Sequence, residues 1–114
     1  MEIKHKESDS RGMFYIEKEN SLIAELTYHK SHYAASLIEK IPGYSLPIQG
    51  TFFQEFVVQS PKPPAQINAG LLERGILGGL DISDQIPNGM LICVTEMNTR
   101  DDIEALAQAL NELK

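Results

Sequence analysis

One lysine in this sequence has a setting that could carry covalent chemistry. Lys30 stands in a His-Lys-Ser triplet, and a lysine amine can form a Schiff base with an aldehyde cofactor such as pyridoxal phosphate. That chemistry also needs a loop that cradles the cofactor phosphate and an acid against the pyridine nitrogen. Neither is recognisable along the chain. We therefore interpret Lys30 as the opening of a helix, and the alternative of a catalytic lysine as the weaker one.

The glycines of the stretch GILGGLD, residues 75–81, suggest a phosphate-binding loop. Such a loop needs glycines between a strand and the start of a helix, so that backbone N–H groups point at the anion. Here the glycines follow a predicted helix and lead toward a strand. The order predicts a helix end and a tight turn rather than a binding site.

The cysteine and the histidines are candidate nucleophile and metal ligands. Cys93 lies in the apolar run 90–94, where a cysteine behaves as a small hydrophobic side chain, and no adjacent base would stabilise its thiolate. His5, His29 and His32 are not spaced like a zinc site, and one cysteine cannot complete such a site. His29 and His32 could form a weak adventitious metal pair if the helix begins early. We expect a core cysteine and no metal site.

Acidic residues offer the remaining candidates for proton transfer. Glu55 and Glu96 lie in or just after apolar strands, so a covering layer would raise their pKa values, although solvent-facing glutamates are commoner. Two carboxylates form an acid–base pair only across a cleft, and the sequence shows none. Asp101, Asp102 and Glu104 fit the positive end of a helix dipole. We predict no catalytic, cofactor-binding or metal-binding residue and no cofactor.

Length and composition limit the class of protein. The 114 residues allow one domain, residues 1–114, and 42% of them are hydrophobic, which suffices for a core. No run approaches the roughly 20 apolar residues of a membrane span, and the charged start lacks a secretory segment. The net charge is -6 with scattered basic residues, which argues against nucleic-acid binding. We expect a cytoplasmic protein that binds neither membrane nor nucleic acid.

The first 29 residues read as three strands. Leu22, Ala24 and Leu26 alternate with polar residues in SLIAELTYH, which predicts a strand, and the stretches EIKHKE and GMFYIEKE predict two more. The charged segment Lys18–Ser21 is typical of a hairpin turn. We therefore expect a three-stranded β-meander, which needs a covering layer.

The remainder alternates helices and strands. Helical spacing runs from Ser31 to Ile41, TFFQEFVVQ predicts a strand, and Pro64 suits the start of a helix that Gly75 can end. A short strand is plausible in ILGGLDI, and GMLICVTE reads as a buried strand. Thr99 opens the last helix with a capping-box variant.

These elements predict the fold class α+β. The expected form is a two-layer sandwich, an N-terminal three-stranded β-meander followed by α-β-α-β-α, with a mostly antiparallel sheet and helices on one face. An unpaired strand or uncovered apolar surface could dock a second copy, so we also predict a homodimer.

Residues 30–114 resemble the C-terminal end of subunit 1 of the two-subunit bacterial glycine decarboxylase, the P-protein of the glycine cleavage system. The stretches that carry the resemblance follow one another in order: KSHYAA, FFQEFVV, PKPPAQIN, LLERGILGGLD and CVTEMNTRDDIEAL. The resemblance implies a small-domain fragment of a pyridoxal-phosphate enzyme of fold type I. It further implies that the cofactor lysine belongs to the partner, glycine decarboxylase subunit 2.

Residues 1–28 resemble the opening strands of small GNAT-type acetyltransferases through MEIKH, GMFYIE and AELTY. No glycine-rich pyrophosphate loop follows residue 28, so acetyl-CoA has no recognisable anchor. The two resemblances predict a chimera joined near Tyr28–Lys30, a folded domain without enzymatic activity of its own. The alternative is a part of glycine dehydrogenase (decarboxylating) subunit 1 that acts in glycine cleavage with a partner subunit, and acetyl transfer ranks last.

Overall fold

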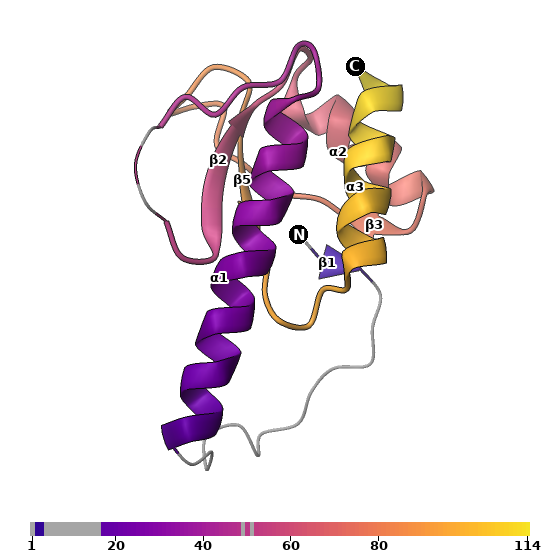
Figure 1. Ribbon diagram of the computed structural model, residues 1–114. Helices are drawn as coiled ribbons and strands as arrows, with labels where there is room; N and C mark the ends of the chain where they lie inside the picture. Colours follow the sequence, from indigo (N-terminus) through magenta and orange to yellow (C-terminus); the bar gives the residue numbers. More distant parts are fainter. Residues whose placement is uncertain (1, 4–16, 49, 51) are drawn as a thin grey trace.

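The computed structural model describes residues 2–3, 17–48, 50 and 52–114, and it confirms the α+β class (Figure 1). These described residues form three helices and five short strands, in chain order β1 Glu2–Ile3, α1 Glu17–Glu39, β2 Glu55–Gln59, α2 Pro64–Glu73, β3 Ile76–Leu77, β4 Leu80–Asp81, β5 Gly89–Cys93 and α3 Arg100–Leu113. No helix within these ranges is both long enough and apolar enough to cross a membrane.

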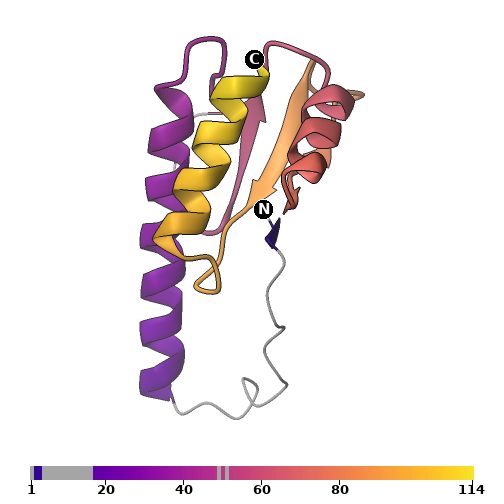
Figure 2. The same ribbon diagram turned by 90° about the vertical axis from the view of Figure 1, so that its right-hand side faces the viewer.

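Two layers make up the body of the molecule. Strands β2, β5 and β4 form an antiparallel sheet in the order β2-β5-β4, and β1 pairs with β3 in a separate antiparallel pair. Buried residues of all three helices share one core cluster with those of β2 and β5, so the helices cover one face of the sheet. In Figure 2, α3 stands in front of β2, with α1 on one side and α2 on the other. The side chains of Phe56, Val58, Met90 and Ile92 are at most 5% exposed and belong to the core cluster, together with Leu106 and other helix residues. The alternation of buried positions along each strand follows from the pleat, which turns successive side chains to opposite faces.

The predicted β-meander is confirmed only at Glu2–Ile3, which form β1, although β1 pairs with β3 rather than with a meander neighbour. SLIAELTYH and the predicted turn Lys18–Ser21 both lie in α1, which runs unbroken through Glu39, while the meander residues 4–16 lie outside the described residues. The buried positions of α1 recur every three or four residues: Thr27, Ser31, Ala34, Ala35 and Ile38. Two of these are polar, so a search for apolar periodicity misses the helical stripe. Leu22 and Leu26, which suggested a strand, are 58% and 43% exposed.

From residue 31 onward most predicted elements are confirmed. Pro64 begins α2, and Gly75 after its end has a φ of +77°, a left-handed conformation that glycine adopts without strain. Thr99 caps α3, because its side chain accepts a hydrogen bond from the N–H of Asp102 and the Asp102 carboxylate accepts one from the N–H of Thr99. The predicted short strand of 76–82 is instead two short strands, β3 and β4, which belong to different sheets.

Candidate functional site

Helix α1 and the loop after β5 meet through Lys30 and Glu96. The ammonium group of Lys30 donates a 2.9 Å hydrogen bond to the backbone carbonyl of Glu96. The Thr27 hydroxyl donates to Oε2 of Glu96 at 3.0 Å and accepts from the Glu96 N–H at 3.2 Å. Thr27 is 2% exposed, so these bonds stand in a largely dry environment. The two residues therefore fix the loop to the middle of α1.

The loop itself, residues 95–98, is closed by its own hydrogen bonds. Asn98 is 3% exposed, and its side-chain oxygen accepts from the Thr95 N–H at 3.0 Å while its N–H donates to the Thr95 carbonyl at 3.1 Å. The Met97 N–H donates to the Thr95 hydroxyl. Because Thr99 then caps α3, this loop sets both the start of α3 and its position beside α1.

The other flank of α1 is fixed to the segment before β2. The Ser31 hydroxyl lies within hydrogen-bond distance of the carbonyls of Tyr28 and Phe53. His32 Nε2 donates to the Phe52 carbonyl at 2.9 Å, and the two rings stack at 4.0 Å between centroids. His32 also stacks on Tyr28. This arrangement uses His32 for packing, and no group of three His, Cys, Asp or Glu side chains among the described residues could hold a metal ion.

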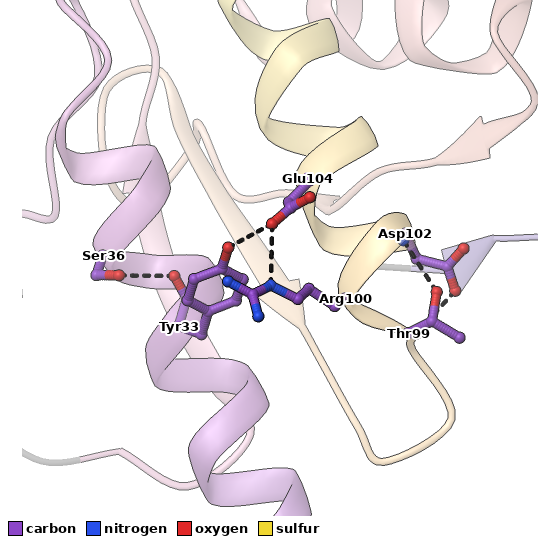
Figure 3. Close-up of polar contacts among 6 residues, drawn as sticks. All are labelled: Tyr33, Ser36, Thr99, Arg100, Asp102 and Glu104. Atoms are coloured by element: carbon purple, nitrogen blue, oxygen red, sulfur yellow. Dashed lines mark hydrogen bonds and ion pairs between the residues drawn. The ribbon is translucent and has the colours of Figure 1, made fainter.

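Arg100, Tyr33 and Glu104 join α1 to α3 on the surface (Figure 3). The Tyr33 hydroxyl donates a 2.6 Å hydrogen bond to Oε2 of Glu104, and Arg100 Nε donates to the same oxygen at 3.1 Å. The Arg100 guanidinium also lies 5.3 Å from the Tyr33 ring centroid. The hydrogen bond from Tyr33, and then that from Arg100, holds the pKa of Glu104 below its ordinary value. In the sequence, Glu104 is explained only by its place near the positive end of the helix dipole. The contact of Glu104 with Tyr33 was therefore not predicted.

Cys93 and Glu55 are cross-strand neighbours in the β2–β5 pair. Cys93 is half-buried rather than fully in the core, and Glu55 is exposed. Burial raises the pKa of the Cys93 thiol, and the negative charge of Glu55 acts in the same direction. A thiol of this kind remains protonated at neutral pH and is a weak nucleophile.

Gly78 and Gly79 pack against protein rather than lining an anion site, whereas nothing would lie within 4 Å of a Cβ on Gly75. A Cβ built on Gly78 would lie 2.3 Å from Oδ1 of Asn68, and one on Gly79 would lie 2.6 Å from the Leu91 carbonyl oxygen. The Asn68 amide donates to the Gly79 carbonyl at 3.0 Å. Glycine is needed here for close approach between α2, β4 and β5, which agrees with the predicted turn.

A helix-covered antiparallel sheet of this form is the class of domain that occurs as one part of larger enzyme chains. The crystal structure of glycine decarboxylase (P-protein) of the glycine cleavage system, in inhibitor-bound form, matches 82% of this chain with a TM-score of 0.77 and 29% identity, over 22% of its own length. A C-DES mutant with glycine covalently linked to its pyridoxal-phosphate cofactor shares the fold alone, with a TM-score of 0.70, 14% identity and 24% of its length covered.

Similar curated proteins show which enzyme subunit the chain is related to. The chain is 48% identical over 93 residues to the probable glycine dehydrogenase (decarboxylating) subunit 1 of Thermomicrobium roseum, and 44% identical over 91 residues to that of Chlorobium limicola. The chain is homologous to the C-terminal region of glycine dehydrogenase (decarboxylating) subunit 1. It spans 21% and 20% of these two relatives, and no protein-family model matches it.

These comparisons correct two expectations. The expectation of a folded domain that is not an enzyme is wrong, because the relatives of the chain are subunits of an enzyme. The chimera and its acetyltransferase-like segment 1–28 find no support. Residues 30–114 are 85 of 114 residues, whereas the Thermomicrobium match covers 79% of the chain, so the homologous part begins before residue 30. The proposed junction at Tyr28–Lys30 also falls inside the unbroken helix α1.

Proposed function

We propose that this chain acts as a C-terminal portion of a glycine dehydrogenase (decarboxylating) subunit 1 and takes part in glycine cleavage together with a partner subunit, glycine decarboxylase subunit 2. The observation that carries the proposal is the 48% identity to the Thermomicrobium subunit over 93 residues. The structural match to glycine decarboxylase, at a TM-score of 0.77, supports it independently.

The described residues by themselves do not fit a pyridoxal-phosphate site. The Lys30 amine is bonded to the Glu96 carbonyl, and the space beside Gly78 and Gly79 is filled by neighbouring side chains and backbone. Neither the cofactor amine nor the phosphate cradle that such a site requires is assembled here. We therefore derive no reaction step from these residues and assign the cofactor to other parts of the assembled enzyme.

This portion of the subunit contributes by holding the loop 95–98 in a fixed position. Thr27 and Lys30 hold the loop 95–98 against α1, and Asn98 keeps that loop closed from within. A loop with this many internal and external hydrogen bonds presents one fixed surface to the rest of the enzyme. Its sequence, TEMN, lies inside one of the stretches that carry the resemblance to glycine decarboxylase.

A hybrid subunit tests the proposal. The stretch of the Thermomicrobium subunit 1 that aligns with this chain would be replaced by this chain. The hybrid would be combined with the subunit 2 of that organism and with an electron acceptor for the oxidative decarboxylation. We expect glycine-dependent release of labelled carbon dioxide from carboxyl-labelled glycine. The matched control is the same subunit with the aligned stretch deleted, which we expect to be inactive. A hybrid that folds and assembles but does not decarboxylate glycine would contradict the proposal.

A further inference from the structure

Three aliphatic side chains form a row across the face of the sheet that the helices leave uncovered. Val57 on β2 is the cross-strand partner of Leu91 on β5, and Leu91 is in turn the partner of Leu80 on β4. Directly paired residues of neighbouring strands place their side chains on the same face of a sheet. We call Val57, Leu91 and Leu80 the outer row.

The outer row lies opposite the core. Phe56 and Val58, on either side of Val57, are 5% and 0% exposed and pack in the core cluster beneath the helices. Successive side chains of a strand point to opposite faces, so Val57 and its row point away from the helices. The core cluster also contains buried residues of α1, α2 and α3, so these helices cover the opposite face of the sheet.

Leu80 is the most exposed of the large hydrophobic side chains described. It is 64% exposed, against 57% for Leu72 on α2, whereas Val57 and Leu91 are half-buried. A contiguous apolar row at the centre of an open sheet face marks a surface that another layer covers.

The domain occurs elsewhere only as a minor part of a longer chain in the proteins compared above. It accounts for 22% of the glycine decarboxylase chain, 24% of the C-DES chain and 21% of the Thermomicrobium subunit. In each case about four-fifths of the polypeptide must be arranged around this unit, and intramolecular domain contacts typically bury about 600–1,500 Å².

We propose that the outer row is the surface on which the remaining part of the glycine dehydrogenase subunit docks. The inference rests on the proposed function and adds to it the face of contact. A second copy of the chain is the competing occupant, and the test separates the two.

Thiol labelling measures whether the row is covered. Leu80→Cys would be introduced into the free chain and into the hybrid full-length subunit described above, and its alkylation rate would be followed by peptide-resolved mass spectrometry, which distinguishes it from Cys93. We expect protection by at least about tenfold in the hybrid relative to the free chain, because a docked surface reacts only after opening. The matched control is Leu72→Cys on the helix layer, which we expect to react at the same rate in both proteins.

The outcomes of the labelling experiment test the docking surface and the proposed function separately. Equal labelling of Leu80→Cys in the free chain and in an active hybrid would overturn the docking surface and leave the proposed function standing. Protection that appears in the free chain and grows with its concentration would assign the row to a second copy and also overturn the proposal. A hybrid that neither folds nor decarboxylates glycine would overturn the proposed function and the docking surface together.

A charge at the same position gives a second measurement. Leu80→Lys should leave the melting temperature of the free chain unchanged, because the side chain is 64% exposed there. The same change should lower the melting temperature of the hybrid subunit, where it would place a charge in an apolar contact. An equal effect of Leu72→Lys and Leu80→Lys in the hybrid would contradict the proposed face.

Discussion

The Tyr33 hydroxyl on α1 donates a 2.6 Å hydrogen bond to the Glu104 carboxylate on α3, 71 positions further along the chain. Arg100 completes the contact by donating to the same carboxylate oxygen while lying over the Tyr33 ring (Figure 3). This cluster and the Thr27–Glu96 contact join α1 to the C-terminal third of the chain at two separate levels. Helix α1 therefore contacts Glu96, Arg100 and Glu104, which are too distant in sequence for local patterns to predict these contacts.

The Tyr33–Glu104 contact predicts a specific dependence of stability on pH. The folded state lowers the pKa of Glu104 below its ordinary value of 4.5, so the contact stabilises the fold above that pH and loses its effect as the pH falls through the lower folded value. Tyr33→Phe should lower the melting temperature at pH 7, and the difference from the parent should shrink in acid. Thermal unfolding followed by circular dichroism from pH 7 to 3 measures this.

Ser36→Ala is the matched control for that experiment. The Ser36 hydroxyl donates to the Tyr33 carbonyl within α1 and does not reach α3 in the contacts of Figure 3. Its removal should shift the melting temperature equally at every pH. A Tyr33→Phe difference that stays constant down to pH 3 would show that the charged carboxylate contributes nothing.

Replacing Thr27 by valine should destabilise the chain by about 1–3 kcal/mol, because the variant keeps the shape but leaves the part-buried Glu96 N–H without this acceptor. Urea denaturation measures the loss. Thr27→Ser retains the hydroxyl and should remain close to the parent. A Thr27→Val variant as stable as the parent would show that these hydrogen bonds contribute nothing to the free energy of unfolding.

Replacing Lys30 by methionine tests the two interpretations of that lysine. Because its amine donates to the Glu96 carbonyl, Lys30→Met should cost about 1 kcal/mol of stability and leave the pyridoxal-phosphate content of the hybrid enzyme unchanged. Lys40→Met, at an exposed position just beyond α1, is the control for loss of a positive charge. Loss of bound cofactor in a folded Lys30→Met hybrid would restore the catalytic interpretation.

Cys93 should be a slow nucleophile whose reactivity depends on Glu55. Burial raises its pKa above the ordinary 9.0, and the Glu55 charge adds to this effect, so the alkylation rate should rise only at alkaline pH. Glu55→Gln should move the midpoint of the rate–pH profile to lower pH. Glu73→Gln, at an exposed position of α2, should leave the midpoint in place. A midpoint unaffected by Glu55→Gln would leave burial as the whole cause.

Among the candidate site residues, the sequence predicted the contacts that are made between residues close together in the chain. The capping contact of Asp102 with Thr99 is local, whereas the close packing at Gly78 and Gly79 depends on Asn68 and Leu91, ten and twelve positions away. The roles of Lys30 and Glu96 could not be predicted, since each depends on a partner 66 positions distant in sequence.

The sequence by itself determined the α+β class and the elements whose ends carry their own chemistry. Pro64 starts α2, Gly75 follows its end with a positive φ, and Thr99 caps α3, because fixed φ, freedom from a Cβ and a side-chain acceptor each act within a few residues. Only the tertiary structure decided that residues 17–29 are helical. The stripe that α1 buries includes the polar side chains of Thr27 and Ser31, and polar groups are stable in an interior only when distant partners satisfy their hydrogen bonds.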